Sequence, residues 1–525
     1  MLFKSYKTFL LVFAVLIVSA CETFDMELQE NPDVLTLESA DVDLLFNTVQ
    51  FTFRNQMNSM GFTTDQTMRM VNQFGFYAFG AGTMNGVWSQ TYTTGTQLEG
   101  LKVFAERDGF TYHYGAAQVM QAVMYLNLVD YIGSAVFTEA NQPEEFPNPG
   151  LNSGEEIYAG ILAMLDEGIT NLQAGGRAPV NDFFGGSAAD WVKFANTVKL
   201  RMALQTRLVD AGASTSTINS LVAGGELIDE IGEDFQFNYG TNGPPVESRH
   251  PLFTGNYING AGGYQSNGLI SYMKDSMSVA DPRLVYYFYR QTNRDLVNEN
   301  PDLVPCLGVA RYDFCHVGDG YYARDHADDE GIPGDQNLRT TYGIYPAGGA
   351  FDEGQGVAAL ASGASGAGAF APIHLSSWTH FMLAEAALTL GTTGNPTTYL
   401  ETGIRIAMAK VRAFNPSGMT NAQIDDYVTE VLAEYAAEDA AGQLDIIIRE
   451  WYLSSFTQGL LPYNNYRRTG YPSFLQDQVT PGGVFPRSLL YPESEQNSNS
   501  NPDFAQNKSL TDRVFWDTNP PGFVN

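Results

Sequence analysis

The densest group of ionisable side chains lies at residues 319–330, within the stretch GDGYYARDHADDEGIPGD. Hard cations such as Ca²⁺ bind six to eight oxygen ligands. The acids that could supply carboxylates to such a site are Asp325, Asp328 and Asp329. Their spacing is not that of an EF-hand loop, and an acidic chain also produces solvated turns in which Arg324 and His326 pair with carboxylates. We favour the turn and expect no metal cofactor, with a structural Ca²⁺ as the alternative.

Signatures of catalysis are missing from the sequence. It contains no H-E-x-x-H, no G-x-x-x-x-G-K-[ST] and no G-x-S-x-G, and the stretch at 363–367 lacks the spacing of a nucleophile elbow. A glycosidase needs two suitably spaced carboxylates, but 59 acidic residues make that condition impossible to test from sequence. We therefore predict a protein that is not an enzyme, with no catalytic residues.

The N-terminus has the features of an export signal. Residues 1–20 combine Lys4 and Lys7 with an apolar run that is too short to span a bilayer. The order Val-Ser-Ala-Cys ending at Cys21 resembles the lipobox of bacterial lipoproteins, in which the cysteine is lipidated. We therefore expect a lipid anchor at Cys21 and no other membrane segment.

Two further cysteines, Cys306 and Cys315, follow in the mature chain. An exported compartment allows them to form a disulfide, which would be structural because their spacing matches no redox or metal motif. The pairing itself is left open by the sequence.

The formal net charge is −31, from 28 Lys and Arg against 59 Asp and Glu. Such a surface repels phosphate backbones and anionic lipid headgroups. We therefore exclude nucleic acid as a partner and expect a globular chain, because 44% of the residues are hydrophobic.

Apolar residues recur with helical spacing along much of the chain. One stripe runs from Ile157 to Leu172 and another from Trp191 to Met202. Further stripes indicate a mostly α-helical fold of helix pairs like those of tetratricopeptide repeats. We expect a single domain at 21–525. Its expected parts are a helical body at about 40–210 and 371–470, a loop-rich insertion at about 211–370 and a loop-rich tail at 471–525.

Nine ordered segments resemble the SusD/RagB family of nutrient-binding outer-membrane lipoproteins, in particular its SusD-like branch from Bacteroidetes. They are the lipobox, LVDYIGSAVFTEA (128–140), GEEIYAGILAMLDEGI (154–169), GGSAADWVKFANTVKLRMAL (185–204), DPRLVYYF (281–288), YYARDHADDEGIP (321–333), TTYGIYPAGGAFD (340–352), YRRTGYP (466–472) and FPRSLLYPESE (485–495). Relatives often carry Trp before the Arg-Arg pair, where this chain has Tyr463-Asn464-Asn465-Tyr466.

The resemblance implies a lipid-anchored protein on the outer surface of the outer membrane. It also implies a SusC-like TonB-dependent transporter as partner and an oligosaccharide or polysaccharide as ligand. The RagB-like relatives imply peptide as the alternative cargo. A surface glycoside hydrolase is a further alternative, for which the sequence offers no set of residues.

A glycan site needs exposed aromatic rings beside amide or charged groups. Two Gly-rich loops, NQFGFYAFGAG and GNYINGAGGYQSNG, combine these residue types, and Trp88 follows the first. The candidate contact residues are Tyr77, Phe79, Trp88, Tyr257, Asn259, Tyr264, Gln265 and Asn267. Phe76 lies in the first loop as well.

Overall fold

The computed structural model describes residues 40–260, 263–293, 302, 304–332, 339–356, 364–505 and 508–525. The expected export signal at 1–20 and the expected lipidation site Cys21 lie outside these residues. Within the described part, no helix is long and apolar enough to cross a membrane.

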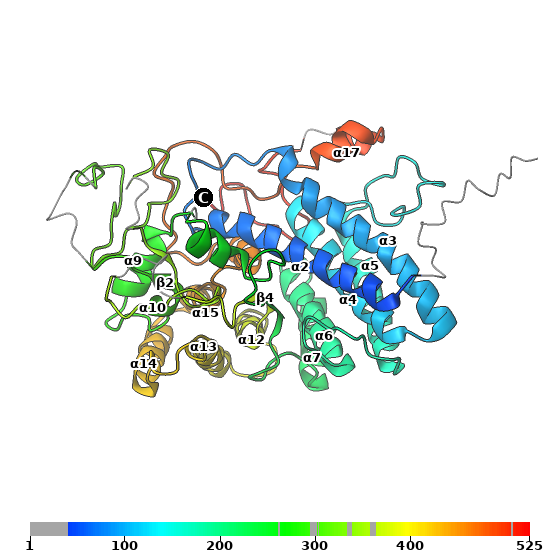
Figure 1. The fold of residues 1–525 in the computed structure, drawn as a ribbon, viewed down its shortest axis with the longest axis horizontal. Coiled ribbons are helices and arrows are strands. Elements are labelled where there is room, and N and C mark those ends of the chain that lie inside the picture. The colour runs from blue at the N-terminus through cyan, green and yellow to red at the C-terminus, as the bar shows by residue number, and fades with distance from the viewer. Residues whose placement is uncertain are drawn as a thin grey trace, which may run out of the picture.

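The structure confirms the mostly α-helical fold (Figure 1). The helices of the N-terminal part are α2 (Val42–Thr67), α3 (Asn85–Asp108), α4 (Thr111–Ile132), α5 (Gly154–Gln173), α6 (Ala188–Gln205) and α7 (Ala211–Gly224). Those of the C-terminal part are α12 (Ser376–Leu390), α13 (Pro396–Arg412), α14 (Asn421–Ala437), α15 (Ala440–Ser454) and α16 (Leu460–Thr469). Consecutive helices pack as pairs, most extensively α4 with α5, α12 with α13 and α2 with α3.

Short elements connect and decorate the pairs. The short helices are η3 (Ala81–Met84), α8 (Pro251–Phe253), the π-helix η4 (Thr254–Ile258), α9 (Asn267–Asp275), α10 (Leu284–Tyr287), α17 (Glu493–Ser498) and η7 (Pro502–Ala505). The strands are β1 (Phe235–Asn238), β2 (Phe288–Tyr289), β3 (Thr341–Tyr342) and β4 (Phe370–His374). Strand β1 pairs antiparallel with β4, and β2 pairs antiparallel with β3.

Local sequence explains why helix α5 forms where it does. Ser153 accepts a hydrogen bond from the backbone N–H of Glu156, and the Glu156 carboxylate accepts one from the backbone N–H of Ser153, which closes a capping box. Its stripe from Ile157 to Leu172 faces α4. Gly115 of α4 allows the close approach, because a Cβ there would lie 2.7 Å from the carbonyl oxygen of Gly168.

Helix α7 departs from the sequence-based boundaries. The sequence predicts a loop-rich insertion from residue 211, but residues Ala211–Gly224 are helical. They are rich in Gly, Ser and Thr, which are weak helix formers. The Asp210 side chain caps the helix by accepting a hydrogen bond from the N–H of Ala213, and Ile218 is buried against the body. Tertiary packing therefore overrides the weak local propensity.

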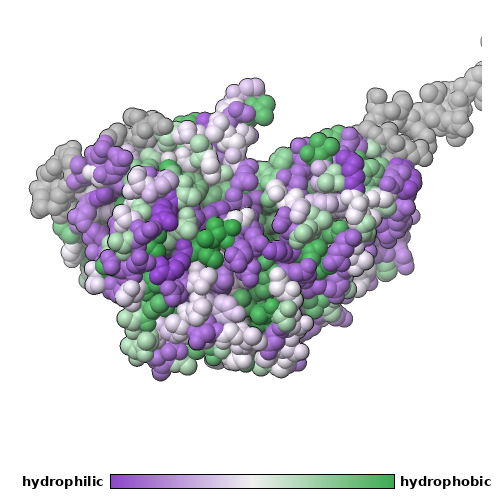
Figure 2. Space-filling model, turned by 90° about the horizontal axis from the view of Figure 1, so that it is seen from below, coloured by the Kyte–Doolittle hydropathy of each residue, from purple (hydrophilic) through white to green (hydrophobic). Residues whose placement is uncertain are grey.

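Most of the core is one continuous apolar cluster that runs through both helical parts and into the tail. The outside is different: on the face shown in Figure 2, hydrophilic residues predominate and apolar ones form small scattered groups. The tail is mostly irregular, and Phe485, Tyr491 and Trp516 bury their side chains in the core. The helices therefore form the packed frame, and the loops form the irregular surface around it.

Candidate functional site

Four loop segments that are far apart in sequence meet on one side of the molecule. We call this surface the loop face. Its segments are residues 70–79, 264–267, 324–329 and 476–484. Two of them belong to the Gly-rich loops in which the sequence predicts a ligand site.

The first two segments are joined by backbone hydrogen bonds. Val71 and Gln265 form an antiparallel bridge, and the N–H of Asn72 donates to the carbonyl of Tyr264 at 2.9 Å. The structure therefore brings together the two loops that the sequence indicated independently.

The other two segments complete the loop face. Ser266 and Arg324 form a parallel bridge. The N–H of Val479 donates to the carbonyl of His326 at 3.0 Å, and the N–H of His326 donates to Oε1 of Gln476 at 2.8 Å. The tail thus holds the acidic segment in place.

Six of the eight predicted contact residues are buried, so the expectation that they are exposed is wrong. They are Tyr77, Trp88, Tyr257, Tyr264, Gln265 and Asn267. Phe79 is half-buried against the core, and Asn259 is exposed. Neighbouring loops fold over the six side chains, and a single loop sequence does not show which of its side chains will be covered. Whether Phe79 and Asn259 touch a ligand stays a prediction.

Tyr77 shows what the buried aromatic residues do instead. Its hydroxyl lies 3.1 Å from the carbonyl oxygen of Thr67 and 2.8 Å from Nε2 of His326. Burial raises the pKa of Tyr77 to about 12 and, together with the charge of Arg69, holds the pKa of His326 well below its usual value. Both groups are therefore neutral near pH 7, and they fasten the loop at 70–79 to the acidic segment.

Two other predicted contact residues, Tyr264 and Asn267, have equally structural roles. The guanidinium of Arg324 lies over the ring of Tyr264, 3.6 Å from its centroid. Nδ2 of Asn267 donates to the carbonyl of Cys315 at 3.1 Å and to Oδ1 of Asp325 at 2.7 Å. Tyr257 is buried beneath a different surface.

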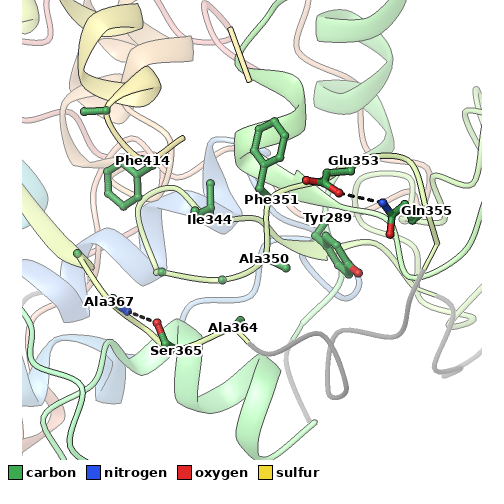
Figure 3. A pocket seen from close by; sticks show the side chains of 14 residues that line it. Tyr289, Ile344, Ala350, Phe351, Glu353, Gln355, Ala364, Ser365, Ala367 and Phe414 are labelled. Atoms are coloured by element: carbon green, nitrogen blue, oxygen red, sulfur yellow. Dashed lines mark hydrogen bonds between the residues drawn. The ribbon is translucent and has the colours of Figure 1, made fainter. Parts of the chain in front are cut away.

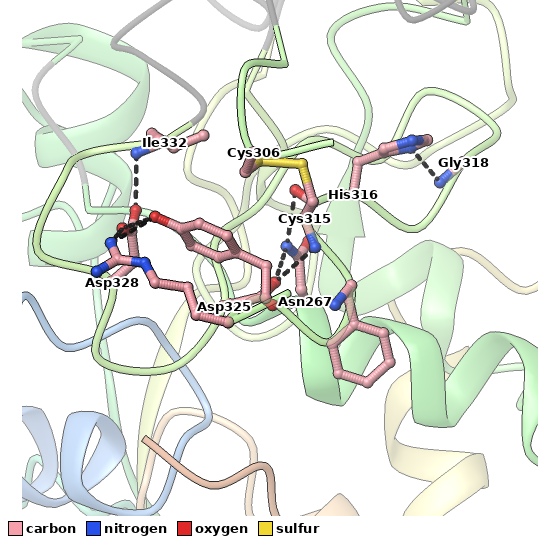
Figure 4. Close-up of a disulfide and its surroundings, with 11 residues drawn as sticks. Asn267, Cys306, Cys315, His316, Gly318, Asp325, Asp328 and Ile332 are labelled. Atoms are coloured by element: carbon pink, nitrogen blue, oxygen red, sulfur yellow. Dashed lines mark hydrogen bonds and ion pairs between the residues drawn. A yellow bond between two sulfur atoms is a disulfide. The ribbon is translucent and has the colours of Figure 1, made fainter. Parts of the chain in front are cut away.

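Cys306 and Cys315 form a disulfide (Figure 4). Next to it, Asp325 accepts hydrogen bonds from the N–H groups of Phe314 and Cys315 at 3.0 and 3.1 Å. The covalent link therefore anchors the loop against which the acidic segment folds.

The interpretation of residues 319–330 as a solvated turn is wrong for Asp325 and Asp328, which are buried. Asp328 accepts hydrogen bonds from the Tyr312 hydroxyl at 3.0 Å and from the N–H of Ile332 at 2.7 Å. Backbone donors therefore stabilise these carboxylates. Among the described residues, no group of three or more His, Cys, Asp or Glu side chains is placed to hold a metal ion.

Removing the disulfide is expected to lower the free energy of unfolding. Replacing Cys306 and Cys315 together by Ser should cost about 2–3 kcal/mol, the range given by the chain-entropy model for a loop of about ten residues. Urea unfolding of both proteins, with and without reductant, measures this. A reductant that destabilises the double variant as much as the wild type would contradict a role for this bond.

The exposed apolar side chains of the loop face are Phe74, Phe76 and Val484, with 65%, 46% and 51% of their surfaces accessible. The Phe76 ring lies over the tail, because a Cβ at Gly483 would be 3.0 Å from it. At the edge of this group lies Asp329, whose Cβ is close to Gly75 and whose side chain is partly exposed. The neighbouring Thr480 and Arg311, whose Nη2 donates to Oδ1 of Asp329 at 3.2 Å, lower the pKa of Asp329, so it is ionised near pH 7.

This arrangement suits a ligand that is partly apolar and partly polar. Exposed rings pack against the C–H faces of a sugar, and a carboxylate beside them accepts hydrogen bonds from hydroxyls. Phe76 is among the residues that the sequence indicated, whereas Phe74 is not. The alternation in NQFGFYAF, with Phe74 and Phe76 outside and Tyr77 inside, is the signal that could have found it.

The chain is a helical protein whose paired helices carry an irregular loop surface. The profile of the SusD-like family, described as "Starch-binding associating with outer membrane", matches residues 26–304 and 349–492, so the chain belongs to this family. The members of this family are binding proteins that associate with the outer membrane.

Solved structures agree on the fold. A chitin-binding protein is 19% identical, with a TM-score of 0.68 over 91% of this chain and 99% of that chain. A chitin-binding SusD homologue from Flavobacterium johnsoniae is 17% identical, with a TM-score of 0.64 over 91% and 98%. A SusD homologue from Bacteroides fragilis is 18% identical, with a TM-score of 0.66 over 90% and 99%. No curated protein matches the chain.

Proposed function

We propose that this chain captures oligosaccharides at the bacterial surface through its loop face and does not cleave them. The observation that carries the proposal is the exposure of Phe74 and Phe76, both on the loop at residues 70–79, beside an ionised carboxylate. Membership of a starch-binding family supports a glycan as ligand. Two similar structures are described as chitin-binding, although at 17–19% identity they support the fold and not the sugar.

The proposal includes a lipid anchor at Cys21 and delivery of the captured glycan to a SusC-like TonB-dependent transporter. The lipobox at residues 18–21 supports the anchor, and the family supports the outer membrane as the location. Co-purification of a barrel transporter with the full chain from outer membranes tests the partner. A full chain that is isolated from outer membranes without any barrel would contradict it.

Calorimetric titration of the full chain in detergent tests the ligand. The panel contains α- and β-gluco-, manno-, xylo-, pectic and chito-oligosaccharides, with mixed peptides alongside and with release of reducing ends followed in the same samples. Saturable binding of one glycan without cleavage is the expected result. Binding of peptides alone, or cleavage of the glycan, would overturn the proposal.

Replacing Phe74 and Phe76 together by Ala is expected to weaken glycan binding at least about tenfold, or about 1.4 kcal/mol, because both stacking surfaces are lost. Both rings are exposed, so the unfolding midpoint should change little. The matched control is Phe51→Ala. Phe51 is also exposed, and at a rise of 1.5 Å per helical residue it lies about 24 Å from the end of α2 that leads into the loop face. Equal loss of affinity in the control would place the glycan elsewhere.

A further inference from the structure

A pocket of about 840 Å³ lies apart from the loop face, beside strands β2 and β3 and the C-terminal end of α13 (Figure 3). None of its lining residues belongs to the four segments of the loop face. Its size falls within the range of roughly 300–1,000 Å³ that is typical of small-molecule sites. The side chains that give it chemical character are Tyr289, Phe351, Glu353, Gln355, Ser365 and Phe414.

Hydrogen bonds between backbone groups hold the floor of the pocket in shape. The N–H of Gly348 donates to the carbonyl of Ile344 at 2.8 Å, and the N–H of Gly366 donates to the carbonyl of Gly348 at 3.1 Å. Gly348 has a φ of 74°, and a Cβ there would lie 2.5 Å from the carbonyl carbon of Gly366. Only glycine fits at this crossing.

Tyr257 supports the same floor from below. Its hydroxyl accepts a hydrogen bond from the N–H of Ala350 at 2.9 Å and donates to the carbonyl of Tyr342 at 2.6 Å. The sequence pointed to Tyr257 as a ligand contact, but the structure makes it a support of the pocket floor. The pocket is therefore preformed and does not need a ligand to open it.

Small residues make up most of the rest of the lining, so the cavity is wide between its few large side chains. These residues are Gly348, Gly349, Ala350, Ala364, Ala367, Gly368 and Ala413. Carbonyl and N–H groups of such segments are not shielded by side chains, and they can offer a ligand additional hydrogen bonds.

Phe351 and Phe414 are half-buried rings of the lining, and each packs against a tyrosine that is not part of the lining. Phe351 packs edge-on against Tyr286, with ring centroids 4.8 Å apart, and Phe414 packs edge-on against Tyr345 at 5.3 Å. Rings held in this way offer contact area at little cost in conformational entropy.

Polar groups lie beside Phe351 (Figure 3). Nε2 of Gln355 donates to Oε2 of Glu353 at 2.9 Å, and both side chains are exposed. In Figure 3, Phe414 and the Glu353–Gln355 pair lie at opposite ends, with Ser365 along the facing side. The pocket therefore combines a ring surface with hydrogen-bonding groups that can both donate and accept.

The charge of the pocket restricts the ligand. Its described lining residues include one carboxylate and no Lys, Arg or His. The nearby Arg290 is paired with Asp352, its Nε lying 2.7 Å from Oδ2 of that carboxylate. An anionic ligand would therefore meet repulsion without a counter-charge, whereas a neutral polyhydroxylated ligand would not.

We propose that this pocket is a second carbohydrate site, which binds a neutral saccharide independently of the loop face. The inference rests on the proposed function for the choice of a sugar as ligand. Rings, a carboxylate, an amide and a hydroxyl around one preformed cavity match the C–H faces and hydroxyls of such a ligand.

A fluorescent reporter tests the pocket directly. The five native Trp residues are all buried, and none of them lines the pocket. Phe414→Trp places an indole ring in the lining, and its fluorescence emission responds to a ligand in the pocket. The variant is titrated with neutral gluco-, manno-, xylo- and chito-oligosaccharides in two backgrounds, with Phe74 and Phe76 either intact or both replaced by Ala. We expect a saturable shift of the emission with the same midpoint, within twofold, in both backgrounds.

Two further variants serve as controls. Adding Ala367→Arg, an exposed position in the lining, places a bulky side chain in the pocket and should abolish the shift while the circular dichroism spectrum stays unchanged. A reporter at Phe51→Trp, outside the pocket, should not respond.

Each other outcome overturns the inference. No shift with any saccharide, or a shift that disappears when Phe74 and Phe76 are replaced, excludes an independent second site. A shift with peptides and not with sugars excludes a saccharide as ligand. Calorimetry on the loop face variants tests the proposed function separately. If the reporter responds but the loop face binds no glycan, the proposed function fails and the second site stands. If the loop face binds glycan but the reporter does not respond, the second site fails and the proposed function stands.

Discussion

Replacing Asp130 by Ala is expected to lower the free energy of unfolding by about 3–5 kcal/mol, the usual cost of leaving a buried charge without its partner. Asp130 is fully buried on α4, and Nη2 of Arg201 lies 2.7 Å from its carboxylate. Three neutral donors complete its surroundings: the Tyr158 hydroxyl at 2.6 Å, Nδ2 of Asn464 at 2.7 Å and Nε1 of Trp516 at 2.9 Å.

These donors explain why the effect should be large. Tyr158 belongs to α5, Arg201 to α6, Asn464 to α16 and Trp516 to the tail. One carboxylate therefore joins four parts of the chain that are remote in sequence. Its loss leaves each donor buried with one acceptor fewer, and unpaired buried polar groups are costly.

Urea unfolding, followed by circular dichroism, measures the difference. The matched control is Asp108→Ala, which removes an exposed ion pair to Arg107 and should change stability by less than about 1 kcal/mol. Asp130→Asn keeps the shape but removes the charge facing Arg201, so it should fall between the two. If Asp130→Ala cost no more than the surface control, the network would not stabilise the fold.

The helical frame could be predicted from sequence because its signal is local. The stripe from Trp191 to Met202 forms α6, with Trp191, Phe194 and Met202 buried as the spacing indicates. The apolar run VYYFY at 285–289 has the composition of a strand, but residues Leu284–Tyr287 are helical and only Phe288–Tyr289 form a strand. Short apolar runs do not distinguish the two periodicities.

The site could be predicted only as far as its loops. Residue types identified the loops containing Tyr77 and Tyr264, and these loops do lie together. Which side chains point outward depends on segments that are more than 50 residues away, such as the tail that covers Tyr77 and the acidic segment whose Arg324 covers Tyr264. Local patterns carry no information about those contacts.

Asp65 is expected to make the stability of this protein fall as pH rises. It lies at the end of α2, where its Oδ1 accepts a hydrogen bond from the N–H of Gly459 at 2.7 Å. Its own carbonyl accepts the N–H of Met70 at 2.8 Å, at the start of the loop face. Burial raises the pKa of Asp65 from 3.8 to about 8, more than the hydrogen bond from Gly459 lowers it.

The sign follows from proton binding. Between about pH 4 and pH 8 the folded state keeps the proton of Asp65, whereas the unfolded state releases it. The stability that this proton provides is fully present below pH 4 and is lost as pH rises through 8. At 1.36 kcal/mol per pH unit, the loss between pH 5 and pH 9 amounts to at most about 4 kcal/mol.

Asp65→Asn isolates this contribution, because the amide oxygen can still accept from Gly459 but the side chain no longer titrates. Relative to the wild type, the variant should gain a few kcal/mol of stability at pH 9 compared with pH 5. Urea unfolding at pH 5, 7 and 9 measures the gap, with Asp425→Asn, an exposed position on α14, as control. Other titrating groups cancel in the comparison, so a gap that stays constant with pH would show that Asp65 is already ionised in the folded protein. That result would also mean that a buried negative charge is tolerated at the end of α2, where the loop at residues 70–79 begins.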